Sequence, residues 1–528
     1  MERVVIIGAG LAGLSAALKL AENGVSCKLV SATPSERAQS VLAEGGINGA
    51  INTMEEDDHV GEHMEETLRA GCNIADIDSV RGLTEHAPKI IRRLFHMGVP
   101  FHTREGNIQL RNFGGQKKKR TAYAKSSTGK AIMSALIDEA RKYEEKGLIM
   151  RYSHHEFLSL LLADDEKCLG AMVMDRYTNQ RLCMQGAVIL AFGGMNGIFP
   201  EKTTGTTENS GDAAAKVLAQ GVSFSNLEMI QYHPTTIGIS GKRCLVSEAA
   251  RGEGGRLFIE KNKIPWYFME EKYPEMGNLM PRDVIAREMH AVLQEEHCGN
   301  QIYLDLRGLS EQVWKEKLPD LRKEVQHYLS IDPVRETIPV EPGIHYFMGG
   351  IDVDRYHRTN IQNLYAAGEC CAQYHGANRL GGNSMLGALY GGSAAAEHLL
   401  LNHSKSVRRK VSDAQAKEPP IDIRPASPGL IIEIRDILLP ALGIVRTEET
   451  LQKAIGQTEQ LLCNDSVNER EKNRLFLAKA MLLSASMRKE SRGAHYREDF
   501  PHTDEAYQGA TLVTAKKEEL RIEIRKCR

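Results

Sequence analysis

Five short segments rich in Gly, Pro and Asn carry the side chains that could do chemistry. Each contains His or Arg, and they span residues 231–235 (QYHPT), 247–255 (SEAARGEGG), 281–283 (PRD), 343–350 (GIHYFMGG) and 375–384 (HGANRLGGNS). Taken singly, a His before Pro is typical of a turn and an Arg is typical of a surface ion pair. Together they supply several cations and hydrogen-bond donors in loops, and a guanidinium matches a carboxylate in bidentate geometry. The pattern predicts an anionic substrate, for which a dicarboxylate is the natural choice.

A second pattern stands at the start of the chain. Residues 4–7 (VVII) are typical of a buried parallel strand, residues 14–20 of a helix, and GAGLAG lies between them. Gly8 permits the tight turn, Gly10 lets the backbone approach phosphates, and Gly13 lets helix and strand pack closely. Free N–H groups at the helix start suit an anion. We therefore expect a dinucleotide pyrophosphate at this turn.

The next strand leaves the identity of the nucleotide open. Residues 25–30 (VSCKLV) are typical of the second strand, whose end would normally carry the acid that binds an adenosine ribose. Ser31 stands there instead, which weakens a nicotinamide interpretation. The run 37–50 that follows is too rich in Gly for a stable helix and suits contact with a flat ligand. The lysines of 117–119 are expected in a solvated turn.

The composition bounds the class of protein. With 528 residues the chain can form several domains, and 42% hydrophobic and 26% charged residues are ordinary values for a globular protein. A net charge of −2 gives no indication of a nucleic-acid partner. The ten cysteines show no CxxC pair or metal-ligand spacing, so we expect no metal site and reduced, buried thiols in a cytoplasmic protein. No apolar run approaches a membrane span.

The order of the elements predicts an α/β chain with insertions. We expect helices within 60–100 and 130–146, a β-rich insert over 149–190 with a hairpin near 175–181, and a return of strand 187–190 to the nucleotide sheet. Strand 364–369 and helix 387–401 complete that sheet, and 402–428 is a polar linker. The prediction is a Rossmann-like nucleotide-binding domain (1–234 and 341–402), an inserted α+β domain (235–340), and a C-terminal helical domain and tail (429–528).

Nine motifs in order give the chain a family resemblance. GAGLAG, AEGGINGA, FGGQKKKRTAYA, QYHPT, SEAARGEGG, PRDVIAR, HYFMGG, AAGE and HGANRLGGNS resemble the flavoprotein subunits of succinate dehydrogenase and fumarate reductase, with L-aspartate oxidase as a close relative. The wording AEGGINGA and PWYFMEEKYPEMGNLMPRD is most similar to the succinate dehydrogenases of Gram-positive bacteria. The resemblance covers residues 4 to about 501. It implies FAD in place of NAD, which accounts for Ser31.

The resemblance also implies roles for the His and Arg residues. It assigns the substrate carboxylates to His233, Ser247, His345 and Arg379, and makes Arg282 the proton donor to the double bond. Arginine, with a pKa above ~12, is a weak acid, but a carbanion-like carbon is basic enough to take its proton. The pair Glu248 and Arg251 would resupply that proton. The implied reaction transfers a hydride from flavin N5 to one alkene carbon and a proton from Arg282 to the other, and closure of the inserted, capping domain would exclude water.

For FAD the resemblance points to residues spread over the nucleotide-binding domain. They are Gly8, Gly10, Ala12, Gly13, Ser31, Gln39, Ser40, Glu44, Gly45, Gly46, Asp212, Glu369, Ser384 and Met385.

Two positions depart from the family pattern. Gln39 stands where succinate dehydrogenases carry the His that bonds covalently to the flavin, so we expect non-covalent FAD and a preference for fumarate reduction. Aspartate oxidases also lack this His, so Gln39 fits either activity. They carry a Glu just before the Gly-Gly of the loop at 112–115, where this chain has Phe113. Burying a substrate ammonium without a counter-charge would cost several kcal/mol, which favours fumarate and succinate over aspartate.

The sequence leaves the electron partner to another chain. No cysteine pattern for an iron-sulfur cluster is present, and the region 430–500 resembles the part of the family that packs near an iron-sulfur subunit. We expect an iron-sulfur subunit or another electron-transfer protein as partner, and contact with the inner face of the cell membrane only through a partner. L-aspartate oxidase remains the alternative activity. The complete His and Arg set argues against a flavin-binding protein without turnover.

Overall fold

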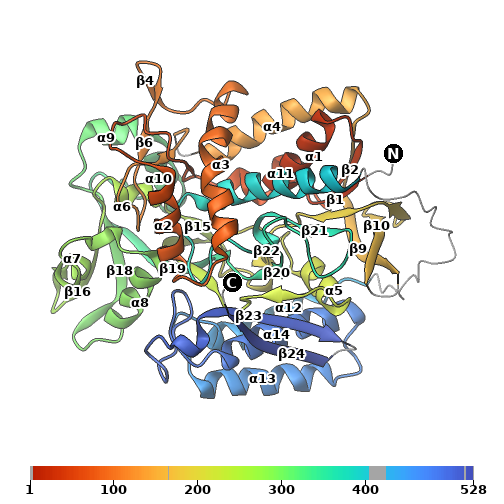
Figure 1. The fold of residues 1–528 in the computed structure, drawn as a ribbon. Helices are drawn as coiled ribbons and strands as arrows, with labels where there is room; N and C mark the ends of the chain where they lie inside the picture. The colour runs from red at the N-terminus through yellow and green to blue at the C-terminus, as the bar shows by residue number, and fades with distance from the viewer. Residues whose placement is uncertain (1–3, 126, 164–165, 404–423, 517–518, 527–528) are drawn as a thin grey trace.

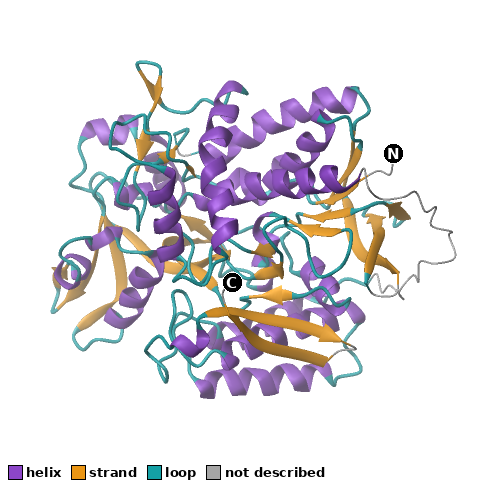
Figure 2. Ribbon diagram, in the orientation of Figure 1, coloured by secondary structure: helices purple, strands orange, loops and turns teal. Residues whose placement is uncertain are grey.

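A computed structural model describes residues 4–125, 127–163, 166–403, 424–516 and 519–526. A central parallel sheet lies under a layer of helices, with a mixed domain on one side and a helical region below (Figures 1 and 2). Most of the expected linker 402–428 lies outside the described residues.

The central sheet collects strands from distant parts of the sequence. Its order is β21-β12-β1-β2-β8, all parallel. The strands are β1 (Val4–Ile7), β2 (Cys27–Ser31), β8 (Ile149–Ser153), β12 (Val188–Leu190) and β21 (Leu364–Ala366). The predicted return of 187–190 and 364–369 to this sheet is confirmed. Strand β8 was expected inside the β-rich insert, but it pairs with β2 and forms the sheet edge.

The two faces of the sheet are covered by different elements. Val4 and Ile6 pack with α1 (Leu11–Glu22), α4 (Thr128–Glu145) and α11 (Asn383–His403), which lie together in Figure 1. Val5 and Ile7 face the opposite core, which includes the antiparallel β9 (His155–Ala163), β10 (Lys167–Asp175) and β11 (Arg181–Gln185). Alternation along a strand sends neighbouring side chains to opposite faces, so the continuous apolar run of β1 is explained by burial on both.

Further elements surround this layer. Helices α2 (Val60–Ala70) and α3 (Ile77–His96) fall within the predicted helical range. Three short strands flank the loop at 112–115 in one sheet, namely β3 (Ile47–Asn48), β6 (Leu110–Arg111) and β7 (Thr121–Ala122). A separate pair consists of β4 (Thr103–Arg104) and β5 (Asn107–Ile108). Helix α5 (Asp212–Ala219) begins after a left-handed Gly211.

The inserted domain is built on a six-stranded antiparallel sheet. Its order is β15-β14-β19-β18-β16-β17. The strands are β14 (Ile230–Ile239), β15 (Lys242–Leu245), β16 (Arg256–Lys261), β17 (Ile264–Trp266), β18 (Cys298–Asp305) and β19 (Ile338–Phe347). The helices are α6 (Ala249–Gly252), α7 (Phe268–Lys272), α8 (Arg282–Val292), α9 (Glu311–Glu316) and α10 (Pro319–Leu329). The expected boundaries at 235 and 340 fall inside β14 and β19, so two continuous strands join the two domains.

The C-terminal region contains more than the expected helices. It includes α12 (Pro428–Ala441), α13 (Glu448–Leu462) and α14 (Glu469–Met487). The tail then forms a hairpin of β23 (Gly509–Lys516) and β24 (Glu519–Lys526), which sequence analysis did not anticipate. The hairpin extends a sheet with β13 (Phe224–Ser225), β20 (Gly350–Asp352) and β22 (Cys371–Ala372), so it is anchored to the nucleotide-binding domain.

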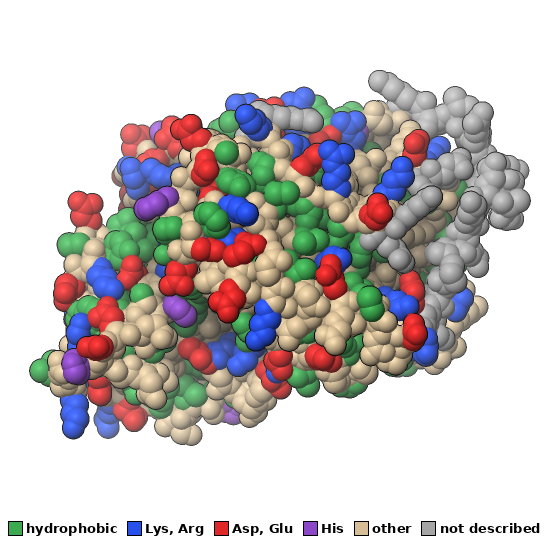
Figure 3. Space-filling view, turned by 90° about the horizontal axis from the view of Figure 1, so that it is seen from below, with side chains coloured by type: hydrophobic (Ala, Val, Ile, Leu, Met, Phe, Trp, Pro, Cys, Tyr) green, Lys and Arg blue, Asp and Glu red, His purple; other side chains and the backbone are tan. Residues whose placement is uncertain are grey.

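The surface is mixed in charge. Figure 3 shows Lys and Arg interspersed with Asp and Glu on the face seen from below. The nine cysteines that the structure describes are free thiols. Four of them are buried, but Cys183 and Cys463 are exposed and Cys72, Cys244 and Cys298 are half-buried, so the expectation of burial was wrong for the exposed pair and met only in part by the half-buried three. Over the described ranges, no helix is long and apolar enough to cross a bilayer.

Candidate active site

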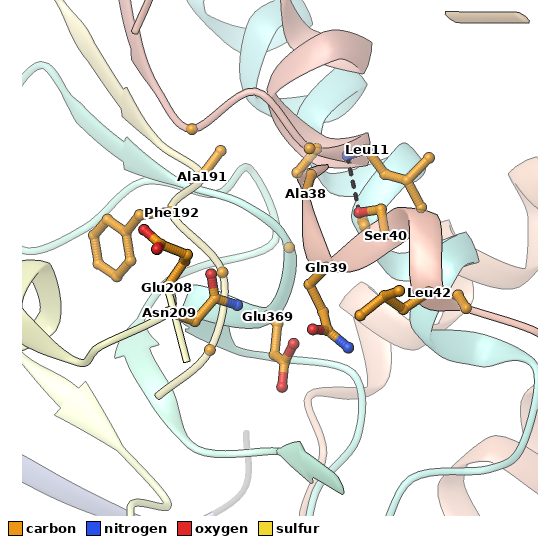
Figure 4. A pocket seen from close by; sticks show the side chains of 18 of the residues that line it. Leu11, Ala38, Gln39, Ser40, Leu42, Ala191, Phe192, Glu208, Asn209 and Glu369 are labelled. Carbon is orange, nitrogen blue, oxygen red and sulfur yellow. Dashed lines mark hydrogen bonds between the residues drawn. The ribbon is translucent and has the colours of Figure 1, made fainter. Parts of the chain in front are cut away.

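The glycine-rich turn has the geometry that its sequence predicts. Gly8 has φ +118°, and a Cβ there would lie 2.0 Å from the carbonyl oxygen of Ala191. A Cβ on Gly13 would lie 1.8 Å from the carbonyl oxygen of Gly8, so helix and strand pack closely only with glycine. The Ser40 hydroxyl accepts a hydrogen bond from the Leu11 N–H at 3.3 Å (Figure 4). The α1 N-terminus therefore opens onto the loop that follows β2.

A cavity of about 500 Å³ begins at this turn and runs to the His and Arg residues. The predicted cofactor residues that line it are Gly8, Gly10, Ala12, Ser31, Gln39, Ser40, Glu44, Gly45, Gly46, Asp212, Glu369, Ser384 and Met385. Gly13 lies behind the wall in its packing role. Figure 4 shows Gln39, Asn209 and Glu369 around the same space. One continuous cavity thus joins a phosphate-binding turn to a cationic end, as a dinucleotide beside a substrate requires.

Polar atoms inside this cavity are left for a ligand. The Ser31 hydroxyl and the Asn209 Nδ2 are buried and have no hydrogen-bond partner among the described residues. The Glu369 carboxyl accepts the Phe347 N–H at 3.1 Å, and burial raises its pKa to about 7. Such unpartnered groups in a cavity with a phosphate turn fit FAD, which offers hydroxyl, phosphate and ring partners.

The C-terminal region contributes to the same cavity through a residue that sequence analysis missed. Arg470 of α14 lines it, 2.8 Å from Glu156 and 3.8 Å from Asp212. Arg474 also donates to the Asp212 carboxylate. Two arginines therefore fix Asp212 at the cavity wall. The sequence did not indicate this contact, because the charged residues of α14 are typical of any surface helix.

The far end of the cavity holds two arginines and two histidines, and one of the arginines, Arg282, is paired with Glu248. His233, Ser247, Arg282, His345 and Arg379 all line it. The His233 and His345 rings are 5.2 Å apart, and the Arg379 guanidinium lies 4.4 Å from the Tyr346 ring centroid. Arg379 Nε and His233 Nε2 are buried without a hydrogen-bond partner in the described chain. The four predicted substrate residues are thus brought together with unused donors.

Burial and positive charge keep both histidines neutral. The pKa of His233 and of His345 is lowered well below 6.5, first by burial and then by the Arg282 guanidinium. Burial also lowers the pKa of Arg379 to about 9. An isolated buried cation is costly, so an anion that enters this end would be stabilised. The arrangement suits a small dicarboxylate.

Glu248 lies between two arginines. Arg282 Nε donates to Glu248 Oε2 at 3.1 Å and Nη1 donates to Gln231 Oε1 at 3.0 Å. On the other side, Arg251 Nη2 lies 3.5 Å from Glu248 Oε1, and its Nη1 donates to the Asn278 carbonyl oxygen at 2.8 Å. Burial would raise the pKa of Glu248, but the Arg282 and Arg251 guanidiniums together lower it to about 2. A charged relay therefore reaches the cavity through Arg282.

Local structure explains this geometry. Arg282 is the first residue of α8, directly after Pro281, and Glu248 precedes the short helix α6 that carries Arg251. The spacing of three does place Glu248 and Arg251 on one face, as expected. On β14, the pairing with β19 shifts register between His233 and Thr236, and such irregularities re-aim side chains near sites.

The two departing positions lie at the cavity. Gln39 Oε1 accepts the Thr206 N–H at 2.5 Å. Phe113 is 2% exposed, and a Cβ on Gly45 would lie 3.1 Å from its ring.

Beyond the lysines of 117–119, Arg120 is fully buried, 2.9 Å from Asp58 and 3.3 Å from Glu66. The solvated-turn expectation covered the lysines only, and the sequence offered no signal that the next residue turns inward.

Comparison with known proteins places this site in a family. Residues 3–385 match the FAD binding domain family, and residues 463–528 match the fumarate reductase flavoprotein C-terminal family. The chain is 38% identical to the succinate dehydrogenase flavoprotein subunit of Bacillus subtilis, covering 95% of this chain and 92% of that protein. It belongs to the succinate dehydrogenase and fumarate reductase flavoprotein family. The protein is an FAD oxidoreductase of that family.

Two further comparisons, one by sequence and one by structure, agree with this assignment. The chain is 32% identical to the L-aspartate oxidase of Streptomyces coelicolor, over 95% of this chain and 89% of that protein. A solved structure of E. coli quinol fumarate reductase matches with a TM-score of 0.90 and 27% identity, covering 100% of this chain and 96% of the other. The flavoprotein fold is therefore shared along the whole chain. Among the described residues, no group of three or more His, Cys, Asp or Glu could hold a metal ion.

Proposed function

We propose that this flavoprotein reduces fumarate to succinate, or catalyses the reverse reaction, with Arg282 as proton donor. One observation carries the proposal. Unpartnered donors of His233 and Arg379 share a cavity with Arg282, whose guanidinium is bonded to the buried carboxylate of Glu248. Carboxylate clamps and a buried proton relay are what reduction of a dicarboxylic alkene requires.

FAD, when bound, supplies a hydride donor or acceptor at its N5 atom. The residues of the chain do the rest. His233, Ser247, His345 and Arg379 hold the two substrate carboxylates, so the carbon-carbon double bond lies between fixed charges. Arg282 gives its proton to one alkene carbon, and the Glu248 carboxylate, ionised at rest, takes up a replacement proton from the Arg251 side and passes it to Arg282. In succinate oxidation the same residues take the proton away.

The cofactor is proposed to be non-covalent. Gln39 occupies the position of the flavin-linking His of the family, and an amide cannot form that bond. Its side-chain oxygen accepts the Thr206 N–H instead. A covalent tether raises the flavin potential in the family, so its absence favours fumarate reduction as the physiological direction.

Electrons are proposed to pass through an iron-sulfur subunit or another electron-transfer protein. The match to the fumarate reductase flavoprotein C-terminal family supports this, as does the likeness to a quinol fumarate reductase. We further propose a cytoplasmic location, at the inner face of the cell membrane where a partner brings it there.

L-aspartate oxidase is the second candidate, favoured by the 32% identity to such an enzyme and by Gln39. Phe113 argues against it. Its buried ring carries no charge for a substrate ammonium at the position where aspartate oxidases have Glu. We therefore place aspartate behind the unaminated dicarboxylates.

Parallel assays of the purified protein test the proposal. Reduced viologen with fumarate, succinate with a dye, and aspartate with oxygen are compared, and the flavin is tested for release on acid denaturation. We expect turnover with fumarate above that with aspartate, and release of FAD. If aspartate were the best substrate, the protein would be an L-aspartate oxidase and the proposed function would be wrong. Flavin that stayed on the precipitated protein would refute the proposal of non-covalent FAD.

A further inference from the structure

Thr204 contacts an active-site histidine from outside the predicted set. Its hydroxyl lies 2.7 Å from His345 Nδ1. The loop that carries Thr204 is fixed beside β19, since the Thr204 N–H donates to the Ile344 carbonyl at 2.9 Å and the Ile344 N–H donates to the Lys202 carbonyl at 3.0 Å. The hydroxyl is therefore held next to the ring by backbone hydrogen bonds on both sides.

Whether His345 can donate a hydrogen bond to a substrate carboxylate depends on which of its two ring nitrogens carries the proton. Burial next to Arg282 lowers its pKa well below 6.5, so the ring is neutral and has one N–H. A substrate carboxylate accepts hydrogen bonds only, so the nitrogen that meets it must be the protonated one. Among the described residues Nδ1 is bonded to Thr204, and no hydrogen bond of Nε2 is found.

We propose that Thr204 is a positioning residue, whose hydroxyl donates to His345 Nδ1 and so keeps the ring proton on Nε2, directed at a substrate carboxylate. This rests on the proposed dicarboxylate function. The His345 hydrogen bond is the one interaction of the Thr204 hydroxyl that the described structure provides, so its proton is available for Nδ1.

The second histidine, His233, has a different partner at its Nδ1 atom. His233 Nδ1 accepts the Thr235 backbone N–H at 3.3 Å, and the Thr235 hydroxyl donates to the Val246 carbonyl at 2.9 Å. That hydroxyl cannot also donate to His233. The two rings are therefore held by different partners, and only His345 has a hydroxyl free to select its tautomer.

The experiment compares three substitutions at Thr204 with a matched control. Thr204→Val replaces the hydroxyl by a methyl group, Thr204→Ala removes it without added bulk, and Thr204→Ser retains it. Thr236→Val is the control, because the Thr236 hydroxyl also donates to β19, at the Glu341 carbonyl, without touching His345. The full chain with FAD is assayed with reduced viologen and fumarate, and fumarate affinity is measured from the change in flavin absorbance.

We expect Thr204→Val and Thr204→Ala to raise the KM and the Kd for fumarate about tenfold, the loss of one hydrogen bond to a charged group. Thr204→Ser and Thr236→Val should stay within about twofold of the wild type, with equal FAD content in all four variants. An unchanged KM in Thr204→Val and Thr204→Ala, or a Ser variant as weak as the Val variant, would overturn the proposal. Wild-type protein that binds fumarate without reducing it would instead refute the proposed function, while the Kd comparison still decides the role of Thr204.

Discussion

Replacing Arg282 by Lys separates the charge of this side chain from its geometry. The guanidinium makes three kinds of contact at once. Its Nε and Nη2 donate to Glu248, its Nη1 donates to Gln231, and it lines the substrate end of the cavity. A Lys ammonium keeps the positive charge beside the buried carboxylate, but a single nitrogen cannot reproduce the planar fork. The variant should fold, because Glu248 remains paired.

The substitution should reduce both the stability, through lost hydrogen bonds, and the rate, through loss of the general acid. One or two buried hydrogen bonds to charged groups are worth about 1.5–3 kcal/mol each, so a modest decrease in stability is expected. A positioned general acid contributes about 10²–10⁴ in rate, or ~3–5 kcal/mol of the barrier. We therefore expect the kcat for fumarate to fall at least a hundredfold. The KM should change less than about threefold, because the residues proposed to bind the carboxylates, His233, His345 and Arg379, are unchanged.

The assay is oxidation of reduced viologen by fumarate, normalised to bound FAD. Arg287→Lys is the matched control, since Arg287 lies five residues further along α8 and bonds to Asp283 and to the Gly493 carbonyl instead. It should retain nearly full activity. If Arg282→Lys kept its kcat within tenfold of the wild type, Arg282 could not be the proton donor.

Three further changes test other parts of the structure. Phe113→Glu should gain aspartate oxidation and lose fumarate reduction, measured as the ratio of the two kcat/KM values, because a carboxylate at this position would pair with an ammonium and repel a dicarboxylate. Gly8→Ala should purify without flavin absorbance, since its Cβ would lie 2.0 Å from the Ala191 carbonyl oxygen; full FAD content would show that the turn can relax. His63 is fully buried and its pKa is lowered to about 3, so folding is favoured above pH 6.5 and weakened as pH falls below it. In chemical unfolding, His63→Gln should lose about 1 kcal/mol less than the wild type between pH 6 and 5, and equal losses would contradict the burial argument.

Local patterns were enough to predict much of the fold. The apolar run of β1 and the glycines after it predicted a strand, a turn and a helix, and the strands at 187–190 and 364–366 were expected in the same sheet. Strand β8 was misassigned, because the sequence of a sheet edge is like that of any short strand. The hairpin of β23 and β24 was missed because it follows a helical region, although the alternation of charged and half-buried residues in β24 is a strand pattern.

The sequence predicted those site residues whose chemistry is evident from the residue type alone. His and Arg in Gly-rich loops indicated an anion site, and the structure brings His233, His345 and Arg379 to one cavity. Residues that act through a neighbour gave no such signal. Thr204 and Arg470 are common residue types in ordinary surroundings, and only long-range contacts reveal what they touch.

The position of Glu248 shows why the cavity and the inserted domain must be considered together. Glu248 and Arg282 belong to the inserted domain, yet Glu248 Oε1 accepts the Gly114 N–H at 3.3 Å from the loop beside the cofactor cavity. A second contact joins the same two parts, where Asn378, next to Arg379, donates to Asp283, next to Arg282. Glu248 is thus bonded to the domain that binds FAD, and Arg282 is bonded to Gln231 of that domain and adjoins Asp283. Movement of the inserted domain away from that cavity would break these bonds and separate Arg282 from Arg379. The proposed proton donor and the proposed carboxylate-binding residue therefore lie together only while the two domains are in contact.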